Sequence, residues 1–275
     1  MHALSARKAF HYCRADLRKK VIRDFGENAD ALWAQVRTGS IKLYDALVIA
    51  DVLKSLRPKK ILEVGAYIGF SARYILELTK SYGAEVVSID PNTNSGLIER
   101  PYEFFKEFVQ DTFPDRSRFV EAYMAREGEC PSAAERIDGN FGEKFDLIFI
   151  DADHQYASVK RDFEICKSLL NPGGVILFHD VFSHLGVKRL MEEIAPISNL
   201  RRPGKALHPF LRMLKKSYDE LVKFKLRESI DGPRNKSSAV NFAAKRQETF
   251  KGGLLSLPQT ILYDLWYDGV GILKT

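Results

Sequence analysis

The stretch that decides the fold is KILEVGAYIGFS at residues 60–71. Residues 61–64 form a short, mostly apolar run that is closed by Gly65, and a helical pattern follows it as far as Leu78. A short strand that turns through glycine into a helix is typical of a βαβ unit. Glycine lets the backbone of such a turn approach a ligand closely, and the free N–H groups of the next helix attract anionic groups.

The same pattern recurs along the chain. Four more strand-like segments alternate with helical stretches, at residues 85–89, 118–122, 145–150 and 174–178. This alternation predicts an α/β fold on a parallel sheet with buried central strands. Two last strand-like runs, 261–265 and 270–273, flank Asp268-Gly269, which is a turn signal. We therefore predict a seven-stranded, mostly parallel sheet that ends in an antiparallel C-terminal hairpin.

The first 58 residues read as helices. Apolar side chains recur at three- and four-residue steps from Phe10 to Phe25, which places them on one face of a helix. A second helical stretch, residues 44–56, stops next to Arg57-Pro58, as helices do before proline. We predict an N-terminal helical cover at residues 1–58 and a main domain at residues 59–275, with a basic helical insertion at about 198–257.

Composition places the chain among ordinary globular proteins. Of its 275 residues, 45% are hydrophobic and 28% are charged, which excludes a disordered or low-complexity chain. The three cysteines form no CxxC pair, which fits a reducing compartment (Cys13, Cys130 and Cys166). No apolar run approaches the roughly 18 residues of a membrane-spanning helix, and the basic N-terminus lacks the apolar core of a signal peptide. We therefore expect a cytoplasmic protein.

The net charge of +6 comes from one segment near the end of the chain. Residues 201–251 hold 14 Lys and Arg against 5 Asp and Glu. A solvated helix that covers the substrate or forms a homodimer is our first interpretation. An anionic substrate, a peripheral membrane contact through residues 210–226 and RNA are alternatives. RNA is the least favoured, because the aromatic residues of this segment fall mostly at apolar helical positions.

The glycine turn indicates which ligand the first strand end holds. The dinucleotide fingerprint needs a second glycine where Tyr67 stands, so a pyrophosphate would be poorly accommodated. A smaller ligand with a carboxylate and an amine fits better, with Glu63 nearby to attract positive charge. Asp90, at the end of the second strand, is placed to bridge two ribose hydroxyls. The alternative is a tight turn whose glycines serve packing alone.

Acidic residues follow the fourth and fifth strands. Asp151 comes directly after residues 145–150, and His179-Asp180 comes directly after residues 174–178. Because neighbouring strands lie about 4.8 Å apart, these side chains can reach one site, where two carboxylates repel each other unless a cation joins them. Mg²⁺ bound there would hold the oxygens of a substrate and lower the pKa of its hydroxyl. Alternatively, Asp151 contacts only the cofactor and Asp180 caps a helix.

A histidine near the same strand end is our candidate general base. His154 follows Asp151 by three residues, and an imidazole with its ordinary pKa of about 6.5 accepts a hydroxyl proton at neutral pH. His179 is the second candidate for this role. Asp153, between the two, is expected to position the loop.

These motifs resemble those of a known family. Residues 62–72 (LEVGAYIGFSA) are similar to the first motif of class I S-adenosylmethionine-dependent methyltransferases, and most similar to the catechol and caffeoyl-CoA type of O-methyltransferase. The phrases DADHQY at 151–156 and NPGGVILFHD at 171–180 resemble those of bacterial sugar and antibiotic O-methyltransferases of the macrocin and cephalosporin-tailoring group. The resemblance runs from Thr38 to Ile194 and resumes at the terminal hairpin.

The resemblance implies a Rossmann-like class I methyltransferase fold that binds S-adenosylmethionine. Gly65 and Ser71 would hold the amino and carboxylate groups of the methionine, and residues 38–41 would close over the ligand. Asp90 would hold the ribose. The full set of cofactor-binding residues implied is Glu63, Gly65, Ala66, Tyr67, Gly69, Ser71, Asp90, Ala122, Tyr123 and Asp151.

The resemblance also implies the reaction, which is methyl transfer to a hydroxyl of a small molecule, with His154 and Asp151 as catalytic residues. Metal-dependent relatives carry two acidic or amide residues after the fifth strand, where this chain has His179-Asp180. The metal ligands implied are Asp151, His179 and Asp180, and the histidine would favour Mn²⁺, Fe²⁺ or Zn²⁺ over Mg²⁺ or would mean that no metal binds. RNA methylation and a non-catalytic cofactor-binding protein remain the alternatives.

Overall fold

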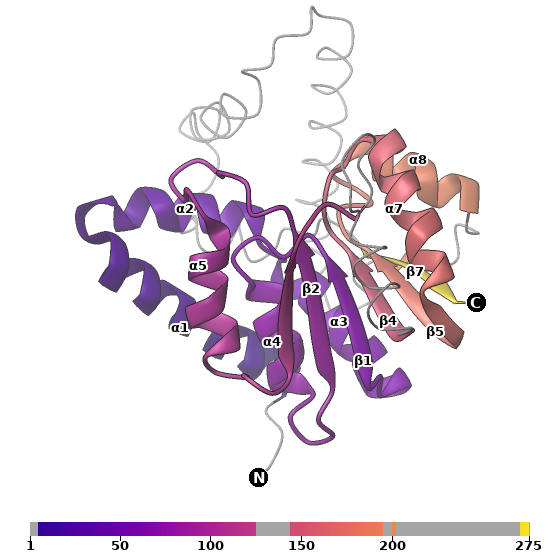
Figure 1. Ribbon diagram of the computed structural model, residues 1–275, viewed down its shortest axis with the longest axis horizontal. Coiled ribbons are helices and arrows are strands. Elements are labelled where there is room, and N and C mark those ends of the chain that lie inside the picture. The colour runs from indigo at the N-terminus through magenta and orange to yellow at the C-terminus, as the bar shows by residue number, and fades with distance from the viewer. Residues whose placement is uncertain (1–4, 125–143, 195–199, 202–269, 275) are drawn as a thin grey trace, which may run out of the picture. The chain divides into compact units, whose positions relative to one another are not determined.

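The structure is a computed structural model that describes residues 5–124, 144–194, 200–201 and 270–274 (Figure 1). The chain divides into two compact units, one of Met1–Arg202 with Trp266–Thr275 and the other of Pro203–Leu265. The second unit lies outside the described residues. The basic segment, apart from Arg201, and the first strand and turn of the expected terminal hairpin therefore stay predictions.

The N-terminal residues form helices, as their apolar stripe predicts: α1 (Ala6–Phe25), the 3₁₀ turn η1 (Gly26–Asn28), α2 (Ala29–Gly39) and α3 (Leu43–Leu56). Helix α3 ends at Arg57, whose left-handed backbone (φ 50°) closes the helix before Pro58. At its other end, the Asp45 side chain accepts a hydrogen bond from the backbone N–H of Lys42, which completes a capping box.

The main domain is built on one sheet. Its strands are β1 (Lys60–Val64), β2 (Glu85–Asp90), β3 (Ser117–Glu121), β4 (Phe145–Ile150), β5 (Leu170–Phe178), β6 (Leu200–Arg201) and β7 (Val270–Lys274). They lie in the order β3-β2-β1-β4-β5-β7-β6. Strands β1 to β5 are parallel, and β7 runs antiparallel to both β5 and β6. The mostly parallel sheet with an antiparallel C-terminal strand is confirmed.

The antiparallel edge holds one strand that the sequence does not predict. Strand β6, of two residues, pairs with β7 on its outer side, and residues 261–265, the expected hairpin partner, lie outside the described residues. A strand as short as Leu200–Arg201 carries no alternating pattern, so the sequence gives no sign of it.

Helices cover both faces of the sheet (Figure 1). Those that follow the strands are α4 (Phe70–Leu78), α5 (Pro101–Phe105) with the π-helical turn η2 (Lys106–Gln110), α7 (Tyr156–Ser168) and α8 (Leu185–Ile194). Successive strand residues point to opposite faces, so Val175 and Leu177 pack into the core under α1 to α5, whereas Ile176 and Phe178 pack under α7 and α8.

The N-terminal helices pack directly onto the main domain. The ring of Phe10 on α1 is 2% exposed and meets Phe70 and Tyr74 edge to face, with ring centroids 5.4 and 6.1 Å away. The Tyr74 hydroxyl donates a hydrogen bond to the carbonyl of Ala46 on α3, at 3.0 Å. The helical cover therefore shares the hydrophobic core of the domain beneath it.

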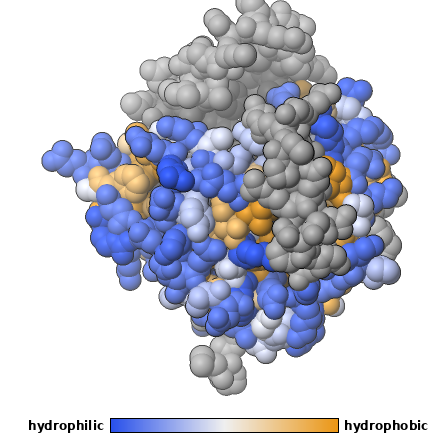
Figure 2. Space-filling view, viewed as in Figure 1, coloured by the Kyte–Doolittle hydropathy of each residue, from blue (hydrophilic) through white to orange (hydrophobic). Residues whose placement is uncertain are grey.

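The visible surface of the described residues is mainly hydrophilic, with apolar side chains gathered in a few small patches (Figure 2). Large apolar side chains that are exposed include Tyr12, Ile22, Leu97, Phe182 and Leu185. Among the described helices, none combines the length and the apolar character needed to cross a membrane.

Replacing Phe10 with alanine tests whether the cover folds with the domain. We expect Phe10→Ala to lower the free energy of unfolding by about 3–5 kcal/mol, because a buried aromatic ring is lost from a packed core. Tyr12→Ala, two residues away on α1 and 48% exposed, is the control and should change it by less than about 0.5 kcal/mol. Urea unfolding followed by circular dichroism measures both; equal effects would show that the cover does not fold with the domain.

Candidate active site

The carboxyl ends of β1, β4 and β5 meet at one edge of the sheet, since these strands are neighbours and parallel. Backbone hydrogen bonds continue past the strand ends. Asp151 donates its N–H to Val64 at 2.8 Å, and His179 donates to Ile150 at 3.0 Å. The glycine turn after β1 and the acidic residues after β4 and β5 are thereby brought together, as the sequence predicts.

Two positions of the turn require glycine. Gly65 has a φ of +90°, and a Cβ atom there would lie 2.1 Å from the carbonyl oxygen of Asp151. Gly69 has a φ of +85°, and its Cβ would lie 2.4 Å from a methyl group of Val109. Gly65 thus allows close backbone packing and brings β1 into contact with the residue that begins the acidic cluster, whereas Gly69 leaves room for the side chains of Val109 and Phe105.

The carboxylate of Asp90 binds the backbone amides of the glycine turn. Its Oδ2 accepts hydrogen bonds from the N–H groups of Ala66 and Tyr67, at 3.1 and 2.8 Å, and its Oδ1 accepts one from Asn92 at 2.8 Å. Burial outweighs these bonds and raises the pKa of Asp90 above its usual range. A carboxylate beside these amides disfavours a pyrophosphate there, and Oδ1 keeps a lone pair for a hydroxyl. The sequence analysis missed Asn92, whose side chain also binds the backbone of Tyr102.

Glu63 lies beneath the turn and is completely buried. It accepts hydrogen bonds from the hydroxyls of Ser88, at 2.6 Å, and of Ser71. Burial outweighs both bonds and raises the pKa of Glu63 to about 7. The structure therefore directs the Ser71 hydroxyl to Glu63, and its expected contact with the methionine carboxylate stays a prediction.

The remaining cofactor residues surround this turn. Gln35 on α2 donates a hydrogen bond to the Tyr67 hydroxyl at 3.0 Å, and a Cβ on Gly39 would lie 3.2 Å from the Tyr67 ring. The segment expected to close over the ligand, residues 38–41, thus begins beside the turn. On the other side, Ala122 donates its N–H to the carbonyl of Asp90 at 3.1 Å, and Tyr123 follows it, half-buried.

Four side chains form a tight cluster beyond β4 and β5. Nδ1 of His179 lies 3.0 Å from Oδ1 of Asp151 and 3.5 Å from Oδ1 of Asp180. Nε2 of His154 lies 2.6 Å from Oδ2 of Asp180 and 3.8 Å from Oδ1 of Asp151. Asp180 adopts a left-handed backbone (φ 61°). Its Oδ1 accepts a hydrogen bond from the hydroxyl of Ser183, with the two oxygens 2.7 Å apart. Oδ1 of Asp153 accepts a hydrogen bond from the backbone N–H of Gln155 at 3.1 Å, and its expected role in positioning the loop stays a prediction.

The charges of the cluster compensate one another. Burial alone would lower the pKa of His154, but Asp151 and Asp180 outweigh it and raise that pKa to about 10. The pKa of His179 is also raised, by the same two carboxylates against its burial. In return, the histidines hold the pKa values of Asp151 and Asp180 below their usual range despite burial.

One expectation is corrected by these pKa shifts. The two histidines supply positive charge beside the carboxylates. His154 was expected to keep a pKa of about 6.5, which suits a base at neutral pH. With a pKa raised to about 10, it is protonated at neutral pH unless the carboxylates beside it are neutralised.

The cluster also has the donor set of a cation site. Ligand atoms of Asp151, His179 and Asp180 all lie within 4.8 Å of one another, and so do those of His154, Asp180 and His184. The buried Nε2 atoms of His154 and His179 have no aligned hydrogen-bond partner among the described residues. A ring nitrogen that lies close to carboxylate oxygens but makes no aligned hydrogen bond to them can bind the same cation as those oxygens.

Two members of this neighbourhood escaped the sequence analysis. Asp45 on α3 lies 3.3 Å from Nε2 of His179, and His184 at the start of α8 lies 3.5 Å from Asp180. Neither belongs to a recognisable motif, and Asp45 comes from a helix more than 100 positions earlier in the chain. Helix α3 holds two acids in a largely apolar sequence, Asp45 and Asp51, and the sequence alone does not show that Asp45 is the buried one.

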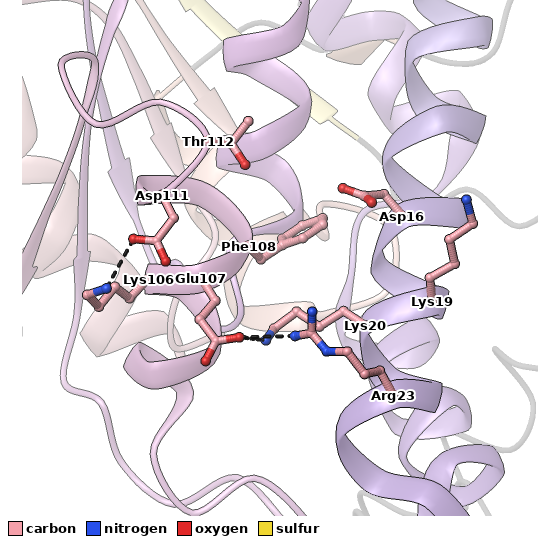
Figure 3. A pocket seen from close by; sticks show the side chains of 9 residues that line it. All are labelled: Asp16, Lys19, Lys20, Arg23, Lys106, Glu107, Phe108, Asp111 and Thr112. Atoms are coloured by element: carbon pink, nitrogen blue, oxygen red, sulfur yellow. Dashed lines mark hydrogen bonds and ion pairs between the residues drawn. The ribbon is translucent and has the colours of Figure 1, made fainter.

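A hollow of about 590 Å³ in the described residues lies apart from this chemistry (Figure 3). It is formed by α1 and the α5–η2 segment. Glu107 binds both Arg23, at 3.1 Å, and Lys20, while Lys106 binds Asp111 at 3.0 Å. Its charged groups are largely engaged with one another, so this hollow is a set of surface ion pairs.

Replacing Glu63 with glutamine tests the buried acid through the pH dependence of stability. Because its pKa rises from 4.5 to about 7 on folding, the folded protein keeps a proton that the unfolded chain releases. Wild-type stability should therefore fall by about 1.4 kcal/mol per pH unit between about pH 5 and 7 relative to Glu63→Gln, and level off above. Denaturant titrations at several pH values measure this, with Glu85→Gln at an exposed position of β2 as control. Parallel curves for wild type and Glu63→Gln would contradict it.

Comparisons with known proteins find similarity over part of the chain. The family described as a methyltransferase domain matches residues 62–181. Catechol O-methyltransferase B of Danio rerio is 31% identical over 137 residues, which cover 49% of this chain and 47% of that one. O-methyltransferase hkm8 of Aspergillus hancockii is 27% identical over 124 residues, 45% of this chain and 43% of that one.

Among solved structures, the O-methyltransferase from Bacillus cereus in complex with SAH is 22% identical, with a TM-score of 0.48, over 68% of this chain and 81% of that one. The chain spans about half the length of the curated relatives it matches. The part of the chain that is similar to a methyltransferase domain, residues 62–181, holds both the glycine turn and the acidic residues after β4 and β5.

Proposed function

We propose that this protein transfers the methyl group of S-adenosylmethionine to a hydroxyl group of a small molecule. The observation that carries the proposal is the contact between the glycine turn and the acidic cluster. Gly65 approaches the backbone of Asp151 so closely that no Cβ fits between them. A cofactor on the turn would therefore present its sulfonium close to a cluster of carboxylates and imidazoles.

The turn suits the nucleoside and amino-acid ends of this cofactor. Asp90 sits at the end of β2 with a lone pair on Oδ1 left for a ribose hydroxyl, and Ala122, which donates its N–H to the carbonyl of Asp90, and Tyr123 would lie on the adenine side. On the opposite side, Gly65, Ser71 and the buried Glu63 would surround the methionine. Residues 38–41, which begin beside Tyr67, would cover the ligand.

The donor set of the cluster fits a divalent cation. Asp151, His179 and Asp180 would hold it, with the unaligned ring nitrogens as the supporting observation. A cation bound there would hold the substrate oxygens and lower the pKa of the hydroxyl. Because one donor is an imidazole nitrogen, we propose that Mn²⁺, Fe²⁺, Co²⁺ or Zn²⁺ is preferred over Mg²⁺.

The reaction needs one bond formed and one broken at the methyl carbon. The substrate oxygen forms a bond to that carbon, the carbon–sulfur bond breaks, and the sulfonium becomes a neutral thioether. The hydroxyl proton passes to a base, which we assign to Nε2 of His154 in its neutral form. Asp151 and Asp180 lie against this ring, so they hold it in place and stabilise the positive charge that it gains.

Binding of S-adenosylhomocysteine tests the cofactor site. We expect isothermal titration to give a Kd below about 1 mM, and Asp90→Ala to weaken it at least about tenfold, since hydrogen bonds to a charged carboxylate are lost. Asp115→Ala, at an exposed turn, is the control. Circular dichroism checks that each variant is folded. Absence of binding to the folded wild-type protein would overturn the proposed function.

Replacing His154 with alanine separates binding from turnover. We expect His154→Ala to leave the S-adenosylhomocysteine affinity within about twofold and to lower kcat by about 10²- to 10⁴-fold, the usual contribution of a general base. His11→Ala, at an exposed position of α1, is the control. Turnover is measured as S-adenosylhomocysteine release with a panel of catechols and sugars. Full turnover by His154→Ala would contradict the assignment, and cofactor binding without transfer to any panel member would favour the non-catalytic alternative.

A further inference from the structure

We propose that Asp45, supplied by the N-terminal helix α3, is a positioning residue that holds the His179 ring in its cation-binding orientation. The inference rests on the proposed function, because it assigns the support of one of the proposed ligands. Neither the glycine turn nor the acidic motifs include Asp45. Its role follows from three observations about its burial, its two contacts and the segment that places it.

The first observation is that His179 is held between carboxyl groups on both edges of its ring. Its Nδ1 faces Asp151 at 3.0 Å, and its Nε2 faces Oδ2 of Asp45 at 3.3 Å. The Asp45 side chain is completely buried, and that of His179 is 5% exposed. A ring buried between two such groups has its orientation set by them.

The second observation concerns the proton on the ring. An imidazole that binds a cation through Nδ1 keeps its proton on Nε2, and a buried N–H of a ligand histidine is usually given to a carboxylate or a carbonyl. Nε2 of His179 has no aligned hydrogen-bond partner among the described residues. The Asp45 carboxylate, at 3.3 Å, is close enough to accept a hydrogen bond from that N–H once the two groups are aligned.

The third observation is how Asp45 is itself held. Its Oδ2 accepts the backbone N–H of Lys42 at 3.2 Å, in the capping box of α3. The buried Lys42 ammonium in turn donates to the carbonyls that precede it, those of Arg37, Thr38 and Ser40, at 2.9, 2.9 and 2.6 Å. The segment proposed to cover the cofactor is therefore joined through Lys42 and Asp45 to His179.

This arrangement gives the N-terminal helices a part in the chemistry. The same carboxylate caps α3 and supports a residue at the end of β5, so a change at the covering segment reaches His179 through one side chain. Outer carboxylates of this kind typically contribute 10- to 100-fold to metal affinity.

The test compares Asp45→Asn with Asp51→Asn in the full-length protein. Asparagine keeps an oxygen for the Lys42 N–H but removes the charge beside His179, whereas Asp51 is exposed on the same helix. We expect Asp45→Asn to weaken Co²⁺ binding about 10- to 100-fold by isothermal titration and to change the visible spectrum of bound Co²⁺. Asp51→Asn should match the wild type in both. An Asp45→Asn protein with wild-type Co²⁺ affinity and spectrum would overturn the proposal.

A second measurement reads the His179 ring without any metal. In protein labelled with ¹⁵N-histidine, we expect Asp45→Asn to shift the ring nitrogen signals of His179, assigned with His179→Ala, while Asp51→Asn leaves them in place. Unchanged signals would overturn the role of Asp45 even where Co²⁺ does not bind. Titration with S-adenosylhomocysteine is run on the wild type and on all variants. If the wild type does not bind it, the proposed function fails, whereas the role of Asp45 is judged by the ring signals alone.

Discussion

The structure depends on the parallel alignment of three strand ends. Backbone hydrogen bonds from Asp151 to Val64 and from His179 to Ile150 carry the sheet one residue beyond its strands. This extension sets Gly65 against Asp151 and sets Asp151 against His179. The proposed cofactor site and the proposed cation site therefore share one backbone framework, in which a shift of β4 would move both.

Electrostatic compensation is the second constraint at this edge. Burial disfavours the charged forms of Asp151 and Asp180, and it also disfavours the protonated forms of His154 and His179. The two carboxylates stabilise the protonated histidines, and the two histidines stabilise the ionised carboxylates, so the charged state of the cluster is stable. A divalent cation held by Asp151, His179 and Asp180 would offset the negative charge of the carboxylates, which would lower the pKa of His154 and favour the neutral ring that acts as a base.

Much of this architecture follows from local sequence. Strand β4 begins and ends where its apolar run predicts, and the order of strands and helices predicts a parallel sheet. The start of β5 at Leu170 was missed, because Asn-Pro-Gly-Gly at 171–174 reads as a turn, although Leu170 pairs with Phe145 across a register shift. The motifs located Asp151, His154 and Asp180, but the raised pKa of His154 depends on neighbours that only the fold brings together. Asp45 and His184 were missed for the same reason.

The central claim is that one edge of the sheet holds both the methyl donor and a cation. A crystal structure of the protein with S-adenosylhomocysteine and Mn²⁺, with anomalous diffraction to locate the metal, tests it most directly. We expect the ribose to lie at Asp90 and the sulfur to face the acidic cluster. We expect the anomalous peak to lie among the side chains of Asp151, His179 and Asp180. A nucleoside bound elsewhere, or a turn filled by the protein's own side chains, would contradict it.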